Sequence, residues 1–197
     1  MISFPFHEDL TFEGQSITLH TLHRADAVSF YRLVKKNHDD LLHSFPIMCE
    51  ELSSLFRTRS WLAERRRRQA RGQSLVLGIR SREDGALIGY LAAVHMDHRV
   101  PKCELAYFLD VASRGKGWML EALQLLLDYL FYQLGFNKVL CRVATENIAS
   151  LRLLDALGFV REGLIRNDFR SGQGVLGDCV YMGRVHPRTV NKDNVSG

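Results

Sequence analysis

A glycine-containing turn at residues 114–119 is the segment whose residue types most directly suggest chemistry, and it reads Arg-Gly-Lys-Gly-Trp-Met. An apolar segment precedes it and a long apolar helix is expected after it, so its backbone N–H groups would lie at a helix N-terminus. Such N–H groups, the helix dipole and two cations suit a diphosphate. Gly115 and Gly117 would let that ligand approach the backbone closely. A tight structural turn explains the same glycines, so the turn alone is a weak signal.

Other common ligand motifs do not fit the sequence. A P-loop needs Gly-Lys-Ser/Thr, whereas Lys116 is followed by Gly117. A dinucleotide fingerprint needs a third glycine and an acidic residue about 20 residues further on, and neither is in place. The cysteines have no CxxC or zinc-finger spacing, so we expect no metal site and reduced core thiols at Cys49, Cys103, Cys141 and Cys179.

A second segment, residues 147–163, reads Asn-Ile-Ala-Ser-Leu-Arg-Leu-Leu-Asp-Ala-Leu-Gly-Phe-Val-Arg-Glu-Gly. It resembles the NxxSxxLLexLGFxxEG segment of the Gcn5-related N-acetyltransferases (GNAT), especially their branch of ribosomal-protein N-terminal acetyltransferases (RimJ/RimL-like). In that family the turn at 114–119 would be the Q/R-x-x-G-x-G/A pyrophosphate loop. Residues 163–166 and 177–181 look like the closing hairpin of the branch. The resemblance extends over residues 16–185.

This resemblance implies an acetyl-CoA-dependent N-acetyltransferase with an α/β (α+β) fold, in which helices flank both faces of a mixed, mostly antiparallel sheet. Residues 1–197 would form one domain, with a core at 16–185 and a polar tail at 191–197. Three positions depart from the family pattern: Met119 for Gly or Ala, Val111 for proline, and Asp155 for Glu. None removes a reacting group. The residues implied for the coenzyme are Phe108, Leu109, Arg114, Gly115, Lys116, Gly117, Trp118, Met119, Asn147 and Ser150.

Acetyl transfer to an amine needs a base for the amine, a donor for the oxyanion and a proton for the leaving thiolate. The family's oxyanion donor is a backbone N–H, which here falls at Phe108–Leu109. Glu104 shares a strand face with Phe108, so it is the candidate base, acting through water; a structural pair with a nearby arginine is the alternative. Ser150 and Tyr181 are the candidate acids, with Ser150 preferred.

Asn147 resembles the family residue that hydrogen-bonds the pantetheine arm or a water. Both Asn147 and Ser150 also suit simple capping of a helix. His95, close to the end of an expected strand, could line the cleft or be structural.

Hydrophobic periodicity predicts the elements that position these residues. Central strands at 75–79 and 87–94, buried on both faces, precede a strand at 103–109. We expect a largely buried helix at 117–134 and a helix at 50–71 with Leu52, Leu55, Phe56 and Leu62 inward. The remaining strands are expected at 16–22, 138–143, 159–166 and 175–185, and the remaining helices at 24–36 and 148–157.

Composition restricts the class of protein further. The chain has 197 residues, 46% hydrophobic and 24% charged, with a net charge of +4, which is typical of a globular protein and excludes a disordered or repeat chain. The longest apolar stretch is too short to span a bilayer, and residues 1–10 lack a signal-peptide core, so we expect a cytoplasmic protein with no membrane partner. Either a monomer or a homodimer is compatible with these features.

The acceptor is the least constrained feature. Residues 39–55, which are expected to overlie the cleft, mix acidic and apolar side chains, which suits a peptide N-terminus better than a polyamine. A small-molecule amine (polyamine, amino acid or drug) and a non-catalytic acyl-CoA sensor are the alternatives. The arginine run at 65–68 is a solvated helix face or a docking site for ribosomal RNA. It lacks the interleaved aromatic residues of a nucleic-acid-binding module.

Overall fold

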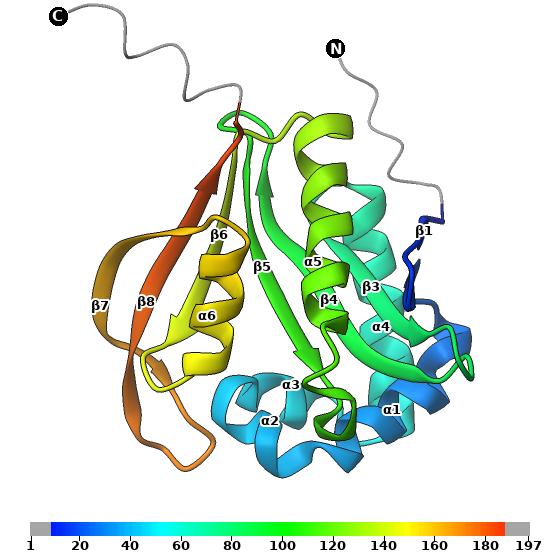
Figure 1. The fold of residues 1–197 in the computed structure, drawn as a ribbon. Helices are drawn as coiled ribbons and strands as arrows, with labels where there is room; N and C mark the ends of the chain where they lie inside the picture. The colour runs from blue at the N-terminus through cyan, green and yellow to red at the C-terminus, as the bar shows by residue number, and fades with distance from the viewer. Residues whose placement is uncertain (1–8, 188–197) are drawn as a thin grey trace, which may run out of the picture.

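The computed structural model describes residues 9–187, and its centre is an eight-stranded mixed sheet (Figure 1). The strand order is β1-β2-β3-β4-β5-β6-β8-β7, and the β5–β6 pair is parallel while the other neighbours are antiparallel. The strands are β1 (Thr11–Glu13), β2 (Ile17–Thr21), β3 (Leu75–Ser81), β4 (Leu87–Asp97), β5 (Lys102–Leu109), β6 (Lys138–Ala144), β7 (Val160–Arg170) and β8 (Leu176–Val185). The expected mixed, mostly antiparallel sheet is confirmed.

Helices cover both faces of this sheet (Figure 1). One core cluster packs the sheet against α5 (Trp118–Asp128), its π-helical extension η3 (Tyr129–Gln133) and α6 (Ile148–Ala156). A second cluster packs the opposite face against four helices that come earlier in the chain. These are α1 (Ala27–Lys36), which follows the short turn η1 (Arg24–Asp26), then α2 (His38–Ser44), α3 (Pro46–Glu51) and α4 (Leu55–Ala70).

The helix expected at 50–71 is two helices, so its predicted start was wrong. Ser54 has an extended backbone and its Oγ accepts a hydrogen bond from the Arg57 N–H at 3.2 Å, which starts α4 afresh. Leu52 and Leu62 are buried as expected. Phe56, which was expected to point inward, has 78% of its surface exposed. It lies in the first turn of α4, on the opposite side from the buried Thr58, Trp61 and Leu62.

The parallel strands β5 and β6 pair over only part of their length. Its register runs from Lys102 opposite Lys138 to Glu104 opposite Leu140. Beyond that point the described residues show no β5–β6 pairing, although β5 continues to Leu109. The two strands therefore separate after Glu104 (Figure 1). From that point the edge of β5 that faces β6 is not paired with it.

The four cysteines are buried free thiols, as predicted. Within residues 9–187, no helix has the length and apolar character that a membrane crossing requires. The polar tail predicted at 191–197 lies outside the described residues.

Candidate active site

The glycine turn lies where a ligand can reach it. Gly115 and Gly117 have φ angles of 77° and 78°, in the left-handed region that glycine tolerates, and Gly117 is the N-cap residue of α5. A Cβ built on either glycine meets no atom of the described residues within 4 Å. Tight packing therefore does not explain these glycines, and the α5 N-terminus is open to an anion.

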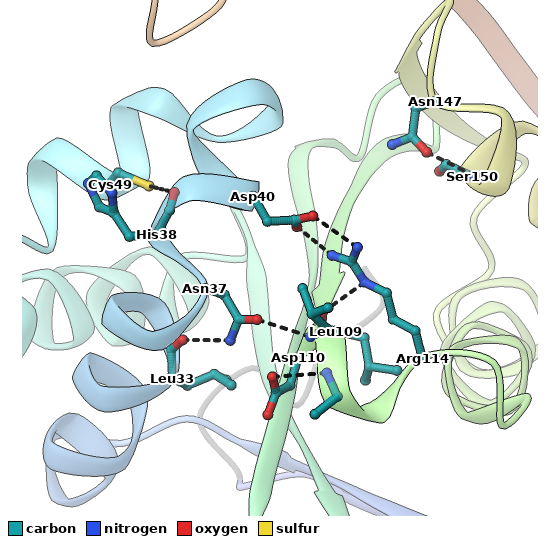
Figure 2. A network of polar contacts seen from close by, with 12 residues as sticks. Leu33, Asn37, His38, Asp40, Cys49, Leu109, Asp110, Arg114, Asn147 and Ser150 are labelled. Atoms are coloured by element: carbon teal, nitrogen blue, oxygen red, sulfur yellow. Dashed lines mark hydrogen bonds and ion pairs between the residues drawn. The ribbon is translucent and has the colours of Figure 1, made fainter.

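Arg114 and Lys116 flank this open backbone but make different contacts. The Arg114 guanidinium forms a two-pronged ion pair with Asp40 on α2, with Nη1 2.9 Å from Oδ1, and its Nε donates to the Leu109 carbonyl at 3.4 Å (Figure 2). Lys116 Nζ lies 4.3 Å from the centre of the Trp118 ring, a cation–π contact. Asp40 thus ties α2 to the loop that precedes α5.

Asn147 and Ser150 lie in the first turn of α6 (Figure 2). Asn147 Oδ1 accepts a hydrogen bond from the Ser150 N–H at 3.1 Å, so Asn147 acts as the N-cap. The Ser150 hydroxyl makes a separate contact: its Oγ lies 2.5 Å from the Tyr107 hydroxyl on β5. This bond joins α6 to β5 in the part of β5 that has separated from β6.

The backbone of β5 alternates between its two neighbours. The Asp110 N–H donates to the Ile88 carbonyl at 2.8 Å, which directs even-numbered residues toward β4. The carbonyls of Leu105 and Leu109 accept from Cys141 on β6 and from Arg114, which directs odd-numbered residues toward the β6 side. Because the N–H and C=O of one strand residue point to the same side, the Leu109 N–H faces the separation and the Phe108 N–H faces β4.

Glu104 lies on the α1–α4 face of the sheet, the face on which Ala106 and Phe108 also lie. Its carboxylate accepts a hydrogen bond from Arg142 Nε at 2.7 Å, and Arg142 Nη1 also contacts Asp168 on β7 at 3.5 Å. The Glu104 hydrogen bond contributes most to a raised pKa of Arg142, so this guanidinium stays charged. The structural pairing expected as the alternative for Glu104 is present.

Tyr181 belongs to this charged group rather than to Ser150. It lies directly opposite Arg142 in the β6–β8 register. Its neighbours Val180 and Met182 pack into the α5–α6 core, so Tyr181 points to the other face. The two candidate acids, Ser150 and Tyr181, are therefore on opposite faces of the sheet.

A shallow pocket of about 430 Å³ lies beside the glycine turn, between the α1–α2 junction and residues 110–112. Asp110 in its wall accepts from Lys36 Nζ at 2.6 Å. Burial raises the pKa of this carboxyl, but the hydrogen bonds from Lys36 and the Ala112 N–H outweigh it and leave the pKa lowered. The Asn37 side chain accepts from the Val111 N–H at 3.0 Å, which fixes the loop to the helices (Figure 2).

The arginine run on α4 is engaged within the chain. Arg65 stacks on Trp61 with its guanidinium carbon 4.6 Å from the ring centre, and Arg66 binds Asp9 at 2.9 Å. Arg67 and Arg68 both pair with Glu64 on the same helix. Arg65 and Arg66 are half-buried, and Arg67 and Arg68 are exposed, so the solvated-face interpretation fits only the second half of the run. His95 has a φ angle of 51° in the irregular stretch of β4 between Val94, which pairs with Glu104, and Asp97.

Sequence reasoning missed Tyr107, Asp40 and Arg142. Tyr107 reads as one apolar residue of a strand, and only its alternation against Ala106 and Phe108 could have placed it on the α6 side. Asp40 and Arg142 make contacts between segments far apart in the chain, for which one sequence carries no signal.

Comparison with known proteins gives one consistent result. The sequence model of the acetyltransferase (GNAT) domain matches residues 16–160. The probable N-acetyltransferase YjcK of Bacillus subtilis is 28% identical over 176 residues, which cover 89% of this chain and 97% of that protein. RimJ of Mycobacterium smegmatis in complex with a CoA disulfide has a TM-score of 0.80 at 19% identity, over 89% of this chain and 84% of that one. RimL, an acetyltransferase of a ribosomal protein solved with coenzyme A, has a TM-score of 0.83 at 18% identity, over 89% and 98%.

Proposed function

The chain belongs to the GNAT acetyltransferase family, whose cosubstrate is acetyl-CoA, and we propose that it transfers the acetyl group to the α-amine at a protein N-terminus. The observation that carries the proposal is the open, left-handed glycine turn at the N-terminus of α5, next to the separation of β5 from β6. Together these features supply a diphosphate site and an adjacent unpaired strand edge.

The residues present fit the coenzyme. The backbone N–H groups of residues 115–119 would bind the pyrophosphate, because the α5 N-terminus offers unpaired donors and the glycines leave room for the ligand. Met119 contributes its N–H while its side chain packs into the α5–α6 core, so the departure from Gly or Ala leaves the open side free. Lys116 would add positive charge at the rim. Arg114, held by Asp40 and Leu109, would keep the loop in place.

Within Phe108–Leu109, the Leu109 N–H is the better oxyanion donor because it faces the separation. A backbone donor fixed in a strand needs no reorganisation as charge develops on the carbonyl oxygen. Glu104 would accept the amine proton through water, while Arg142 holds its carboxylate in position. Ser150 on the other face would protonate the leaving thiolate.

The surface beside Glu104 supports a polypeptide acceptor. Arg142 is exposed, and Ile165 on the neighbouring hairpin has 42% of its surface exposed. The loop between β7 and β8 reaches α2, where the Gly172 N–H donates to the Leu42 carbonyl at 2.9 Å. An open strand face bordered by α2 and this loop can accommodate an extended chain, which a small amine does not require. The fold likeness to RimJ and RimL points the same way.

A thiol-release assay with acetyl-CoA tests the proposal. The acceptors are a short peptide with a free α-amine, the same peptide blocked at its N-terminus but carrying a lysine, and spermidine. We expect release with the free α-amine peptide and little with the other two. Faster release with spermidine would move the function to a small-amine acetyltransferase, and bound acetyl-CoA without release with any amine would indicate a sensor.

A further inference from the structure

The hydroxyl of Tyr107 lies on the part of β5 that has separated from β6. It lies 2.5 Å from Ser150 Oγ and connects β5 to the first turn of α6. Burial raises the pKa of the Tyr107 phenol well above its usual value, against a smaller lowering by the Ser150 contact. The phenol therefore remains protonated and able to donate a hydrogen bond at any physiological pH.

The surrounding groups determine which oxygen donates. Cys141, which also raises the pKa of the Tyr107 phenol, directs its own Sγ hydrogen to the Leu105 carbonyl at 3.6 Å, and its sulfur is only a weak acceptor. A phenol is a more acidic donor than an aliphatic alcohol, and the alcohol oxygen is the better acceptor. These two facts favour donation from Tyr107 to Ser150 Oγ. The hydrogen of Ser150 is then free to point elsewhere.

We propose that Tyr107 is a positioning residue, which donates to Ser150 Oγ and thereby directs the Ser150 hydrogen to the leaving sulfur. The inference rests on the proposed function. It explains why a tyrosine, rather than a phenylalanine, stands on the α6 side of β5. Tyr107 transfers no proton in this account; its hydrogen bond stabilises the negative charge that Ser150 Oγ acquires.

The protonated amine first loses one proton to water held by Glu104. Its neutral nitrogen then forms a bond to the thioester carbonyl carbon, and the carbon–sulfur bond breaks. The nitrogen loses a second proton to water as the amide forms, and the sulfur gains one from Ser150 Oγ. Water then returns a proton to Ser150, so the enzyme is regenerated and the products are the amide and free coenzyme A.

The test is the variant Tyr107→Phe, which keeps the ring and removes the hydroxyl. We expect kcat to fall roughly ten- to a hundredfold, with KM for acetyl-CoA and the melting temperature little changed. In a Ser150→Ala background the same change should have almost no further effect, because the hydroxyl acts only through Ser150. Tyr129→Phe, a buried tyrosine beyond the far end of α5, is the matched control and should keep full activity.

A second readout separates positioning from general packing. With the selenoester of coenzyme A, whose selenolate is a weaker base than the thiolate, the loss caused by Tyr107→Phe should shrink. A packing defect would lower both rates equally and would contradict the proposal, as would an unchanged kcat. A wild-type protein that releases no thiol with any amine would overturn the proposed function itself, whereas an active wild type with an unaffected variant overturns only the role of Tyr107.

Discussion

The two faces of the sheet carry different chemistry at the point where β5 and β6 separate. On the α5–α6 face, the neutral hydroxyls of Ser150 and Tyr107 form a short hydrogen bond, and Tyr107 is partly buried against the core of that face. On the α1–α4 face, Glu104, Arg142 and Asp168 form a charged network that reaches the surface. One strand, β5, supplies residues to both because its side chains alternate.

This difference matches the two proton transfers of an acetyl transfer. A neutral hydroxyl can supply a proton to a leaving thiolate, and a carboxylate can accept one from an ammonium group. Under the proposed function, the coenzyme half of the reaction would take place on the α5–α6 face and the acceptor half on the α1–α4 face.

The largest effect should come from closing the coenzyme loop. Gly117→Val places a branched side chain at a φ of 78° in the space assigned to the pyrophosphate, so acetyl-CoA binding should be abolished in calorimetric titration. Gly85→Val is the matched control, because Gly85 has a φ of 71° and the same open surroundings in the β3–β4 turn. The control should lose stability but bind normally. A folded Gly117→Val protein with unchanged affinity would refute the loop assignment.

Removing the proton donor should have the next largest effect. Ser150→Ala should lower kcat by roughly ten- to a thousandfold with little change in coenzyme affinity. Tyr181→Phe, on the charged face, should change kcat far less. Steady-state kinetics of the two variants test this assignment. A normal kcat for Ser150→Ala together with a strongly reduced kcat for Tyr181→Phe would mean that Tyr181, and not Ser150, protonates the leaving thiolate.

Glu104→Gln tests the acceptor face through its pH dependence. An α-amine has a pKa of about 8, so near neutral pH most of it is protonated and needs a base. We expect kcat/KM to fall at pH 7 and to recover partly as the pH rises and the amine arrives neutral. If Glu104 serves only to hold Arg142, the pH–rate profiles of variant and wild type should run parallel, and the melting temperature should fall.

The smallest effect on activity is expected from the ion-pair cluster of Asp26, Arg80 and His20, which contains no candidate site residue. Asp26 contacts Arg80 at 2.7 Å and His20 at 3.6 Å. Burial raises its pKa, but hydrogen bonds from His20 and the His23 N–H, with the charges of His20 and Arg80, lower it from 3.8 to about 2. The folded state therefore binds the Asp26 proton more weakly than the unfolded chain does, so the carboxylate stabilises the fold above pH 3.8 and loses this effect as the pH falls toward 2.

Asp26→Asn should thus reduce the free energy of unfolding by about 2 kcal/mol at pH 6 and leave kcat/KM unchanged. Urea unfolding at pH 6 and pH 3 measures this contribution, which should be smaller at pH 3. An equal loss at both pH values would show that the cluster acts through packing rather than charge.

The sequence predicted those features that local patterns encode. The central strands, the buried α5 and the glycine turn follow from periodicity and from residues that tolerate positive φ. The Asn147 cap also follows from a local signal. The break before α4 was missed because Ser54 acts through one short hydrogen bond inside an otherwise helical pattern.

The contacts that define the two faces could not be predicted in the same way. Tyr107 meets Ser150 across 43 positions and Arg114 meets Asp40 across 74. Such pairs depend on how the strands separate and how α2 folds back, and these are properties of tertiary packing. Sequence reasoning found both candidate acids, but their placement on opposite faces emerged only from the β6–β8 register.

Hydrogen exchange with and without coenzyme A tests the division between the two faces most directly. Coenzyme A should slow exchange at the amides of residues 115–119 and at Leu109, while amides of β7 beside the charged network should exchange at unchanged rates. Unprotected amides at 115–119 together with slowed exchange in β7 would contradict the account, because the coenzyme would then occupy the face assigned to the acceptor.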